Sequence, residues 1–152
     1  MGKLKDELAR QRWHNNQHVA AVNTLYTAQW LKERLARELV KHKITLQQYY
    51  VLRILRTAHP DGISSAEIRK RMMDDSSDIS RIIARLVKLK YVKRKASKAD
   101  KRVTEIHLTF RGLELIGQLR GIDRFYKSKL TKALTEEEAQ LLSALLDKVR
   151  TC

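Results

Sequence analysis

Residues 79–108 read ISRIIARLVKLKYVKRKASKADKRVTEIHL, and the spacing of their apolar residues changes in the middle. As far as Leu89 the apolar residues recur every three or four positions, which is typical of an amphipathic helix. After Lys90 the spacing falls to two, as in a β-strand, on both sides of a polar segment rich in Lys and Arg. We therefore predict a helix followed by a β-hairpin with an exposed, basic tip.

The predicted helix has two unlike faces. Its apolar face consists of Ile79, Ile82, Ile83, Leu86 and Leu89, and its hydrophilic face of Ser77, Ser80, Arg81, Arg85 and Lys88. The segment DDSSDI, residues 74–79, is dense in residues that cap helices, so the helix is expected to begin there. One face is suited to a protein core and the other to a hydrophilic partner.

Two shorter helices are predicted upstream. Thr45 and Gln48 form a capping-box pattern before a helix over about 46–58, which the turn residues HPDG at 59–62 end. Ser64 and Glu67 form a second such pattern, opening a helix to about Met72 or Met73. The order of short helix, turn and amphipathic helix indicates a helix-turn-helix.

Longer helices are expected on either side of this unit. An apolar period from Val19 predicts a long helix ending near His42. Thr109 can cap a helix through roughly Leu130, and Thr135 a last one with an apolar face of Leu141, Leu142, Leu145 and Leu146. The chain is therefore predicted to be mainly α with one small β-hairpin.

The charge is strongly positive: 32 Lys and Arg against 17 Asp and Glu give a net charge of +15. Residues 45–110 hold fifteen of the cations against seven acids. Such self-repulsion favours a polyanionic partner, nucleic acid first and an anionic membrane surface second. Because no apolar run approaches the roughly 20 residues of a membrane span and the N-terminus has no apolar signal core, we expect a cytoplasmic protein without membrane association.

A helix-turn-helix followed by a basic hairpin is the arrangement of a winged helix-turn-helix DNA reader. Its second helix fits the major groove, where small hydroxyl side chains permit close approach and Arg can bond guanine or phosphate. The hairpin tip would lie along the backbone or enter the neighbouring groove. The candidate DNA contacts are Ser76, Ser77, Ser80, Arg81, Arg85, Lys88, Lys98, Lys101 and Arg102.

The segment DKRVTEIHLTFRG, Asp100 to Gly112, resembles the MarR-type transcriptional regulators, matching their pattern of Asp-x-Arg, five residues, then Leu-Thr-x-x-Gly. The resemblance extends through residues 44–55, 63–95 and 134–146, and covers about 19–150. It implies one MarR-like domain over 1–152, with a winged-helix lobe at about 45–109 and a helical dimerisation lobe from about 1–44 and 110–152.

The resemblance also implies a homodimer that binds pseudo-palindromic double-stranded DNA, as a repressor or an activator, and that a small phenolic or lipophilic effector releases. Asp100 and Arg102 then look like the wing pair, with Arg102 touching DNA and Asp100 orienting it. Lys90 departs from the pattern, because the family usually has glycine at the end of the recognition helix. A left-handed residue there would cost about 1 kcal/mol.

Plainer explanations exist for the same residues. The basic segment 93–102 could be a solvated loop, Arg81 and Arg85 could pair with Asp78, and the serines could be ordinary helix caps. The chain could also be an architectural protein that binds nucleic acid without reading its sequence. An enzyme is disfavoured, because the sequence offers no assignable nucleophile with its base and no phosphate-cradling Gly loop.

No cofactor or metal is expected. His14 and His18 share one helix face, but no Glu or Cys nearby in the sequence completes a metal site. Cys152, the single cysteine, has no partner for an internal disulfide. The aromatic residues Tyr26, Trp30 and Tyr49 are candidates for an effector pocket, although aromatic residues at helical spacing more often belong to a core.

Overall fold

The computed structural model describes residues 4–7, 12–73, 78–97, 99–119, 122 and 131–151. The helices are α1 (Leu4–Glu7), α2 (Asn16–Val40), α3 (Leu46–Ala58), α4 (Ser65–Arg71), α5 (Ile79–Lys88), α6 (Phe110–Gln118), α8 (Thr131–Ala133) and α9 (Glu136–Arg150). The strands are β1 (Ile63–Ser64), β2 (Val92–Ala96) and β3 (Thr104–Leu108). None of the helices in the described ranges is long and apolar enough to cross a lipid bilayer.

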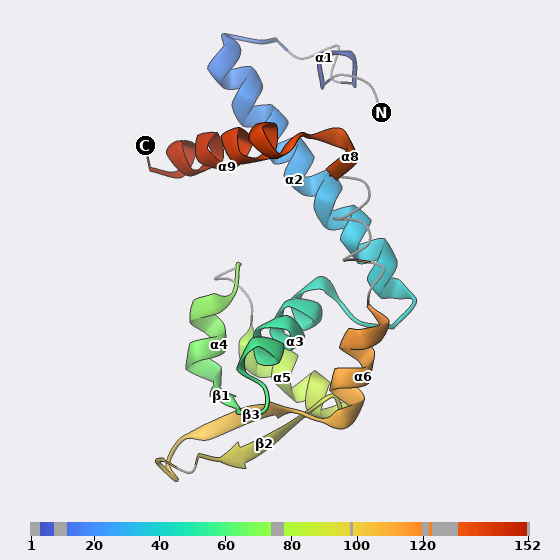
Figure 1. Cartoon of the computed structure of the whole chain (residues 1–152), viewed down its shortest axis with the longest axis vertical. Coiled ribbons are helices and arrows are strands. Elements are labelled where there is room, and N and C mark those ends of the chain that lie inside the picture. Colours follow the sequence, from blue (N-terminus) through green and yellow to red (C-terminus); the bar gives the residue numbers. More distant parts are fainter. Residues whose placement is uncertain are drawn as a thin grey trace.

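The elements form two groups in space (Figure 1). Helices α3 to α6 surround one face and one end of the small sheet, and the β2–β3 hairpin projects from this group. The long helix α2 leads away from it, and α9 crosses α2 in this view, away from the sheet. The mainly helical fold with a β-hairpin is thus confirmed.

Side-chain caps set where the helices begin. The hydroxyl of Thr45 accepts a hydrogen bond from the Gln48 backbone N–H, and the Gln48 side chain accepts one from the Thr45 N–H. Thr135 and Glu138 form the same reciprocal pair at α9. These exchanges satisfy backbone donors that the first helical turn leaves free. The sequence predicted both starts correctly.

The sheet has three antiparallel strands in the order β1-β3-β2, one more than the predicted hairpin. The two residues of β1 pair with Ile106 and Glu105. A strand this short leaves no periodicity in the sequence, which is why it was not predicted. It ties the start of α4 to the middle of β3.

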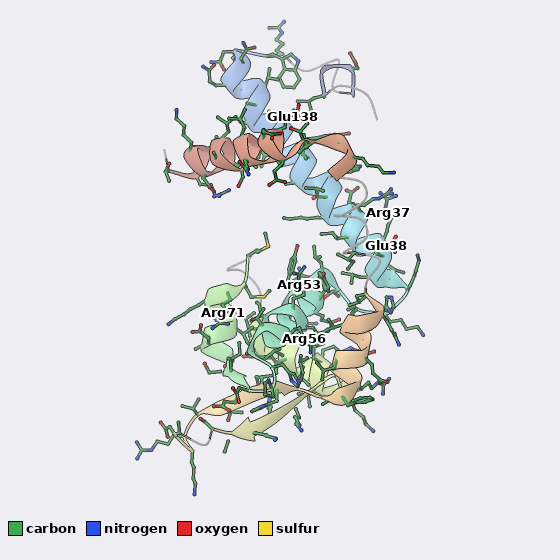
Figure 2. All side chains as sticks on the ribbon, viewed as in Figure 1. Arg37, Glu38, Arg53, Arg56, Arg71 and Glu138 are labelled. Carbon is green, nitrogen blue, oxygen red and sulfur yellow. The ribbon has the colours of Figure 1, made fainter. Side chains whose placement is uncertain are left out.

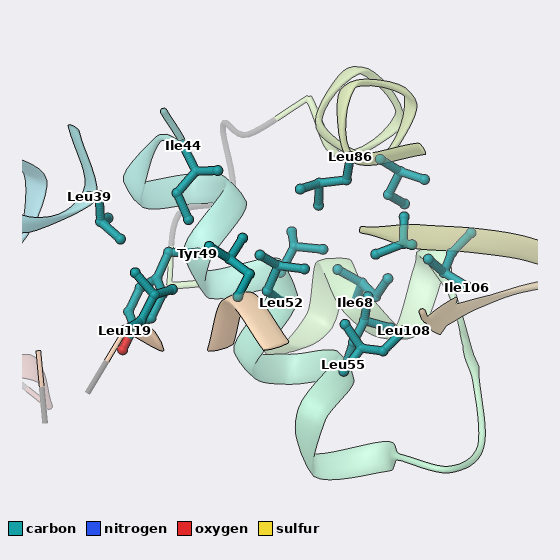
Figure 3. Packing of buried hydrophobic residues seen from close by; sticks show 14 of the residues in the cluster. Leu39, Ile44, Tyr49, Leu52, Leu55, Ile68, Leu86, Ile106, Leu108 and Leu119 are labelled. Atoms are coloured by element: carbon teal, nitrogen blue, oxygen red, sulfur yellow. The ribbon is translucent and has the colours of Figure 1, made fainter. Parts of the chain in front are cut away.

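One hydrophobic core holds the winged-helix group together (Figure 3). Leu52 and Leu55 of α3 and Ile68 of α4 are at most 1% exposed. They pack in the same cluster as the α5 residues Ile79, Ile83 and Leu86 and the β3 residues Ile106 and Leu108, whereas Leu89, predicted for the apolar face, follows α5 and is outside the cluster. Truncating any of these clustered residues to Ala is expected to cost about 2–5 kcal/mol. The core fixes α5 and the hairpin relative to one another.

The turn from α5 into β2 is a Schellman motif with Lys90 at its left-handed position. Lys90 has φ 60°, the Tyr91 N–H donates to the Leu86 carbonyl (3.0 Å) and the Lys90 N–H to the Val87 carbonyl (2.8 Å). These bonds satisfy carbonyls at the helix end. The turn therefore takes the left-handed form although Lys90 stands where the family usually has glycine, and the wing follows in register.

Thr109 and Gly112 connect this turn to α6. The Thr109 hydroxyl lies 2.7 Å from the Lys90 carbonyl oxygen and accepts the Gly112 N–H (3.1 Å). A Cβ at Gly112 would come within 2.2 Å of the Tyr91 carbonyl oxygen. Only glycine therefore fits where α6 crosses the turn.

Two predicted helix boundaries differ from the structure. The long first helix begins at Asn16, with Asn15 as its cap, three residues before the expected Val19. The N-terminal turn is polar and exposed, so hydrophobic periodicity gives no sign of it. The described part of α6 ends at Gln118, and the predicted continuation to Leu130 includes residues 120–121 and 123–130, which lie outside the described residues.

Candidate nucleic-acid interface

Helix α5 presents a continuous basic and hydroxyl-bearing face to solvent. Its apolar side is fixed in the core, with Ile79 and Ile83 each 1% exposed and Leu86 fully buried. The opposite side is exposed and carries Ser80, Arg81, Arg85 and Lys88. The predicted division of the helix is therefore observed, and these four side chains lie together on one surface.

Asp78 serves as the N-cap of α5. Its carboxylate accepts a hydrogen bond from the Arg81 backbone N–H at 3.0 Å. Within the described ranges no ion pair joins Asp78 to the guanidinium of Arg81 or Arg85. The carboxylate thus stabilises the helix start, and the two arginine head groups face solvent.

Three of the candidate contacts, Ser76, Ser77 and Lys98, lie outside the described residues. The predicted helix start falls within residues 74–79, and residues 74–77 of this segment also lie outside the described residues. Cys152 lies outside as well.

The wing tip is a turn closed by Asp100. The Asp100 carboxylate accepts the Arg102 backbone N–H at 2.9 Å, and the Asp100 carbonyl accepts the Val103 N–H at 2.9 Å. The Ser97 N–H donates to the Val103 carbonyl across the loop (2.8 Å). Lys101 and Arg102 are both exposed. The acid shapes the backbone so that the two cations project from the tip; Figure 2 shows nitrogen-ended side chains pointing outward there.

The two faces of the hairpin are chemically different. Pairing of Lys93 with His107 and of Lys95 with Glu105 puts these four on one face, where the His107 Nε2 lies 3.1 Å from a Glu105 oxygen. Arg94 pairs with Ile106 and falls on the other face, next to α5. On that face a hollow of about 180 Å³ is lined by Ser65, Ser80, Ile83, Arg94, Thr104 and Ile106.

A second hollow, of about 270 Å³, lies between α3 and α6. Its lining is Tyr49, Arg53, Arg56, Thr57, Ile116 and Leu119. Figure 2 shows Arg53 and Arg56 both on α3. Of the predicted pocket residues only Tyr49 lines this hollow, whereas Tyr26 and Trp30 lie on α2, each partly buried.

Tyr49, which lines this hollow, lies beside Tyr50. The Tyr49 hydroxyl accepts a bond from Arg53 (3.3 Å), and the Tyr49 and Tyr50 ring centroids are 5.9 Å apart. Burial raises the pKa of Tyr50, the neighbouring Tyr49 adds to the rise, and Arg53 opposes it.

The paired histidines give no sign of a metal site in the described ranges. The His14 backbone N–H donates to the His18 Nδ1 at 3.4 Å, and the ring centroids are 5.1 Å apart. Among the described residues no three His, Cys, Asp or Glu side chains are placed to hold a metal ion. The observed contacts place both rings at the start of α2.

Arg94, Arg53 and Arg56 were not among the residues predicted from the sequence. Arg94 stands within KRK, where alternation along a strand separates its face from that of Lys93 and Lys95. This alternation is visible in the sequence, but only the strand register shows that the face of Arg94 is the one next to α5. Arg53 and Arg56 are three residues apart in a predicted helix, and nothing in the sequence indicates that α6 lies opposite them.

Comparison with known proteins agrees with this geometry. A model of the MarR family matches residues 42–103. The transcriptional regulator PrsX of Escherichia coli is 29% identical over 119 residues, covering 78% of this chain and 72% of PrsX. The regulator PecS of Dickeya dadantii is 26% identical over 147 residues, 91% of this chain and 89% of PecS.

Solved structures show the same fold. A MarR mutant from E. coli complexed with operator DNA is 28% identical, with a TM-score of 0.74 over 91% of this chain and 99% of that one. The MepR–DNA complex of S. aureus, at 23% identity, has a TM-score of 0.78 over 90% and 98% of the two chains. The winged-helix arrangement, the family match over residues 42–103 and these relatives agree, so the chain is similar in sequence and in fold to the MarR family of winged helix-turn-helix proteins.

Proposed function

We propose that this protein is a dimeric, sequence-specific DNA-binding transcriptional regulator, most simply a repressor. The observation that carries the proposal is the joint exposure of the α5 face and the wing tip, with Arg81, Arg85 and Lys88 on one and Lys101 and Arg102 on the other. The charge of residues 45–110 suits a polyanion, and two structurally similar proteins were solved with DNA. Helix α5 would enter the major groove and the wing the groove beside it.

Residues are assigned roles by their position. Arg81 and Arg85 stand one turn apart on α5, where guanidinium groups can form paired bonds with guanine O6 and N7. Ser80 is small enough to let the helix approach closely, and Lys88 meets phosphate. Lys101 and Arg102 contact the backbone at the wing, and Asp100 orders the turn that holds them.

Dimerisation would be carried by the helical lobe, from about 1–44 and 110–152. None of the residues of α9 is buried. Its apolar side chains are 45% to 60% exposed, namely those of Leu141, Leu142, Leu145 and Val149. An apolar stripe of this kind on a 15-residue helix favours burial against a second copy. A two-fold dimer would set two α5 helices about 34 Å apart, one turn of DNA.

The hollow between α3 and α6 is our candidate for an effector site. Tyr49 offers an aromatic wall, and Arg53 and Arg56 offer positive charge, which together suit a small phenolic ligand with an acidic group. Its place at the junction of α3 with α6 would let a ligand alter the spacing of the two lobes. Release of bound DNA by added phenolic acids, lost in Arg56→Ala, tests this assignment.

The deciding experiment is selection of bound duplexes from a random pool by the purified protein. A regulator enriches a two-fold symmetric sequence, and unlabelled duplexes of that sequence compete far better than unrelated DNA. Equal competition by both would favour the alternative, a protein that binds nucleic acid without reading sequence.

A further inference from the structure

We propose that the hollow between α5 and the wing holds one phosphodiester group of the DNA backbone, with Arg94 as its cationic ligand. This rests on the DNA binding proposed above. It adds a binding residue that neither the wing-tip pair nor the α5 face includes.

The position of Arg94 follows from the strand register. Its cross-strand partner is Ile106, which is 2% exposed and belongs to the core, so Arg94 is on the side of the sheet that packs on helices. The Arg94 residue is nevertheless exposed. Because the Arg94 side chain starts on the core side of the sheet and the residue is exposed, we place its guanidinium at the mouth of the hollow, which Ser80 of α5 also lines.

The lining has the chemistry of an oxyanion site. Three hydroxyl groups, from Ser65, Ser80 and Thr104, accompany the guanidinium, and the floor is the buried pair Ile83 and Ile106. None of the six described residues that line the hollow is acidic. A guanidinium bonds two phosphate oxygens at once, and hydroxyls can donate to the same oxygens.

In the proposed mode of binding, the DNA backbone passes over the hollow between α5 and the wing. If α5 lies in the major groove and the wing tip in the groove beside it, the sugar-phosphate strand that separates the two grooves must pass between them. The hollow is the space between the α5 face and strands β2 and β3. A phosphate held there would fix how deeply α5 enters the groove without reading a base.

Lys93 provides a matched control, because it is the neighbouring cation of the same strand on the opposite face. Arg94→Ala and Lys93→Ala remove the same net charge, so the long-range attraction of DNA falls equally in both. We expect Arg94→Ala to weaken binding of the selected duplex about tenfold and to reduce the slope of log affinity against log salt by about 0.9. Lys93→Ala should leave the slope as in the parent protein.

A scan with single methylphosphonate groups then locates the contact. Each neutral linkage removes one phosphate charge from the duplex, and one position should weaken binding of the parent protein yet have no effect on Arg94→Ala. If the hollow instead took a free anion, neutralising DNA phosphates would affect the parent and Arg94→Ala alike. That result, or equal losses in Arg94→Ala and Lys93→Ala, overturns the proposal.

The experiment also separates this proposal from the proposed function. If the parent protein selects no duplex from the random pool, the function itself fails. If the parent selects a duplex that Arg102→Ala binds weakly and Arg94→Ala binds as well as the parent does, DNA binding stands and the phosphate site fails. Arg94→Gln is the second variant, and circular dichroism checks that each variant is folded.

Discussion

The carboxylate of Asp100 bonds the backbone N–H of Arg102 at 2.9 Å, and not the guanidinium of that residue. The two residues were expected to form a pair in which the acid orients the base. The structure shows that the acid orders the turn instead, so the hydrogen-bond donors of the guanidinium are not taken up by Asp100. A side-chain ion pair would have competed with phosphate for the same group.

Asp100→Ala should loosen the wing, because it removes the acceptor that closes the turn. The loss of one hydrogen bond of roughly 1 kcal/mol predicts about fivefold weaker DNA binding. Asp100→Asn keeps an acceptor oxygen at this position and removes a negative charge near DNA, so its affinity should equal or exceed that of the parent. Fluorescence anisotropy with the selected duplex measures both. Equal weakening in the two variants would mean that the carboxylate charge, and not the turn, matters.

Arg102→Ala and Arg85→Ala should have different effects on DNA binding. Arg102 is assigned to backbone phosphate, so its loss should weaken binding to all duplexes and flatten the salt dependence by a slope of about 0.9. Arg85 is assigned to a base edge, so its loss should cost about 1–3 kcal/mol on the selected site and relax preference at one base pair. Repeating the selection with each variant shows the difference. Identical behaviour would show that these roles are assigned wrongly.

Lys90→Gly should stabilise the fold by about 1 kcal/mol, since glycine adopts the left-handed conformation at φ 60° without strain. The nearby Lys88→Gly is the control, because Lys88 is exposed within α5 and has a helical backbone. That change should destabilise by about 0.5–1 kcal/mol. Urea unfolding measures both, and the proposal about Lys90 would be wrong if the two changes had the same sign.

Gly112→Ala should destabilise the protein by several kcal/mol, on the order of the largest single-residue effects. The added Cβ would meet the backbone oxygen of Tyr91 at 2.2 Å, and a backbone atom cannot rotate away as a side chain can. Gly117→Ala is the matched change in the same helix, where nothing lies within 4 Å of the new Cβ. It should stabilise by about 0.5–1 kcal/mol through helix propensity. Thermal unfolding followed by circular dichroism compares the two.

Leu145→Glu should convert a dimer into a monomer, because it places a charge in the middle of the apolar stripe of α9, where Leu145 is 51% exposed. Met73→Glu is the control, because Met73 is an apolar residue of the winged-helix lobe that is 83% exposed and lies outside the proposed dimerisation lobe. Sedimentation velocity should show half the mass only for the first variant. A parent protein that is already monomeric would contradict the proposed dimer.

Much of the winged-helix lobe was predictable because each of its elements carries a local signal. Capping residues such as Thr45 and Thr109 set helix starts, and the change of apolar period at Lys90 marked the passage from helix to strand. The family resemblance made the order of these elements specific. Strand β1 was not predictable, since two residues carry no period and pair only through tertiary contact.

The candidate site was predicted less completely. The exposed face of α5 follows from periodicity alone, so Arg81 and Arg85 were identified from sequence. Arg94 was passed over because its role depends on which face of the hairpin meets α5, and that depends on register. The bond between Asp100 and the Arg102 backbone could not be foreseen either, because the sequence does not distinguish a main-chain partner from a side-chain one.

The Thr109 hydroxyl has a mechanical consequence. One side chain caps α6 through the Gly112 N–H and lies against the Lys90 carbonyl at the end of α5, so these two helix ends are joined by a rigid coupling only a few atoms long. We therefore expect a displacement of α6 to be transmitted to the turn that follows α5. Thr109→Val keeps the shape of the side chain and removes these hydroxyl bonds, so only the bond from the Thr109 backbone N–H to the Tyr91 carbonyl would still link the two ends directly.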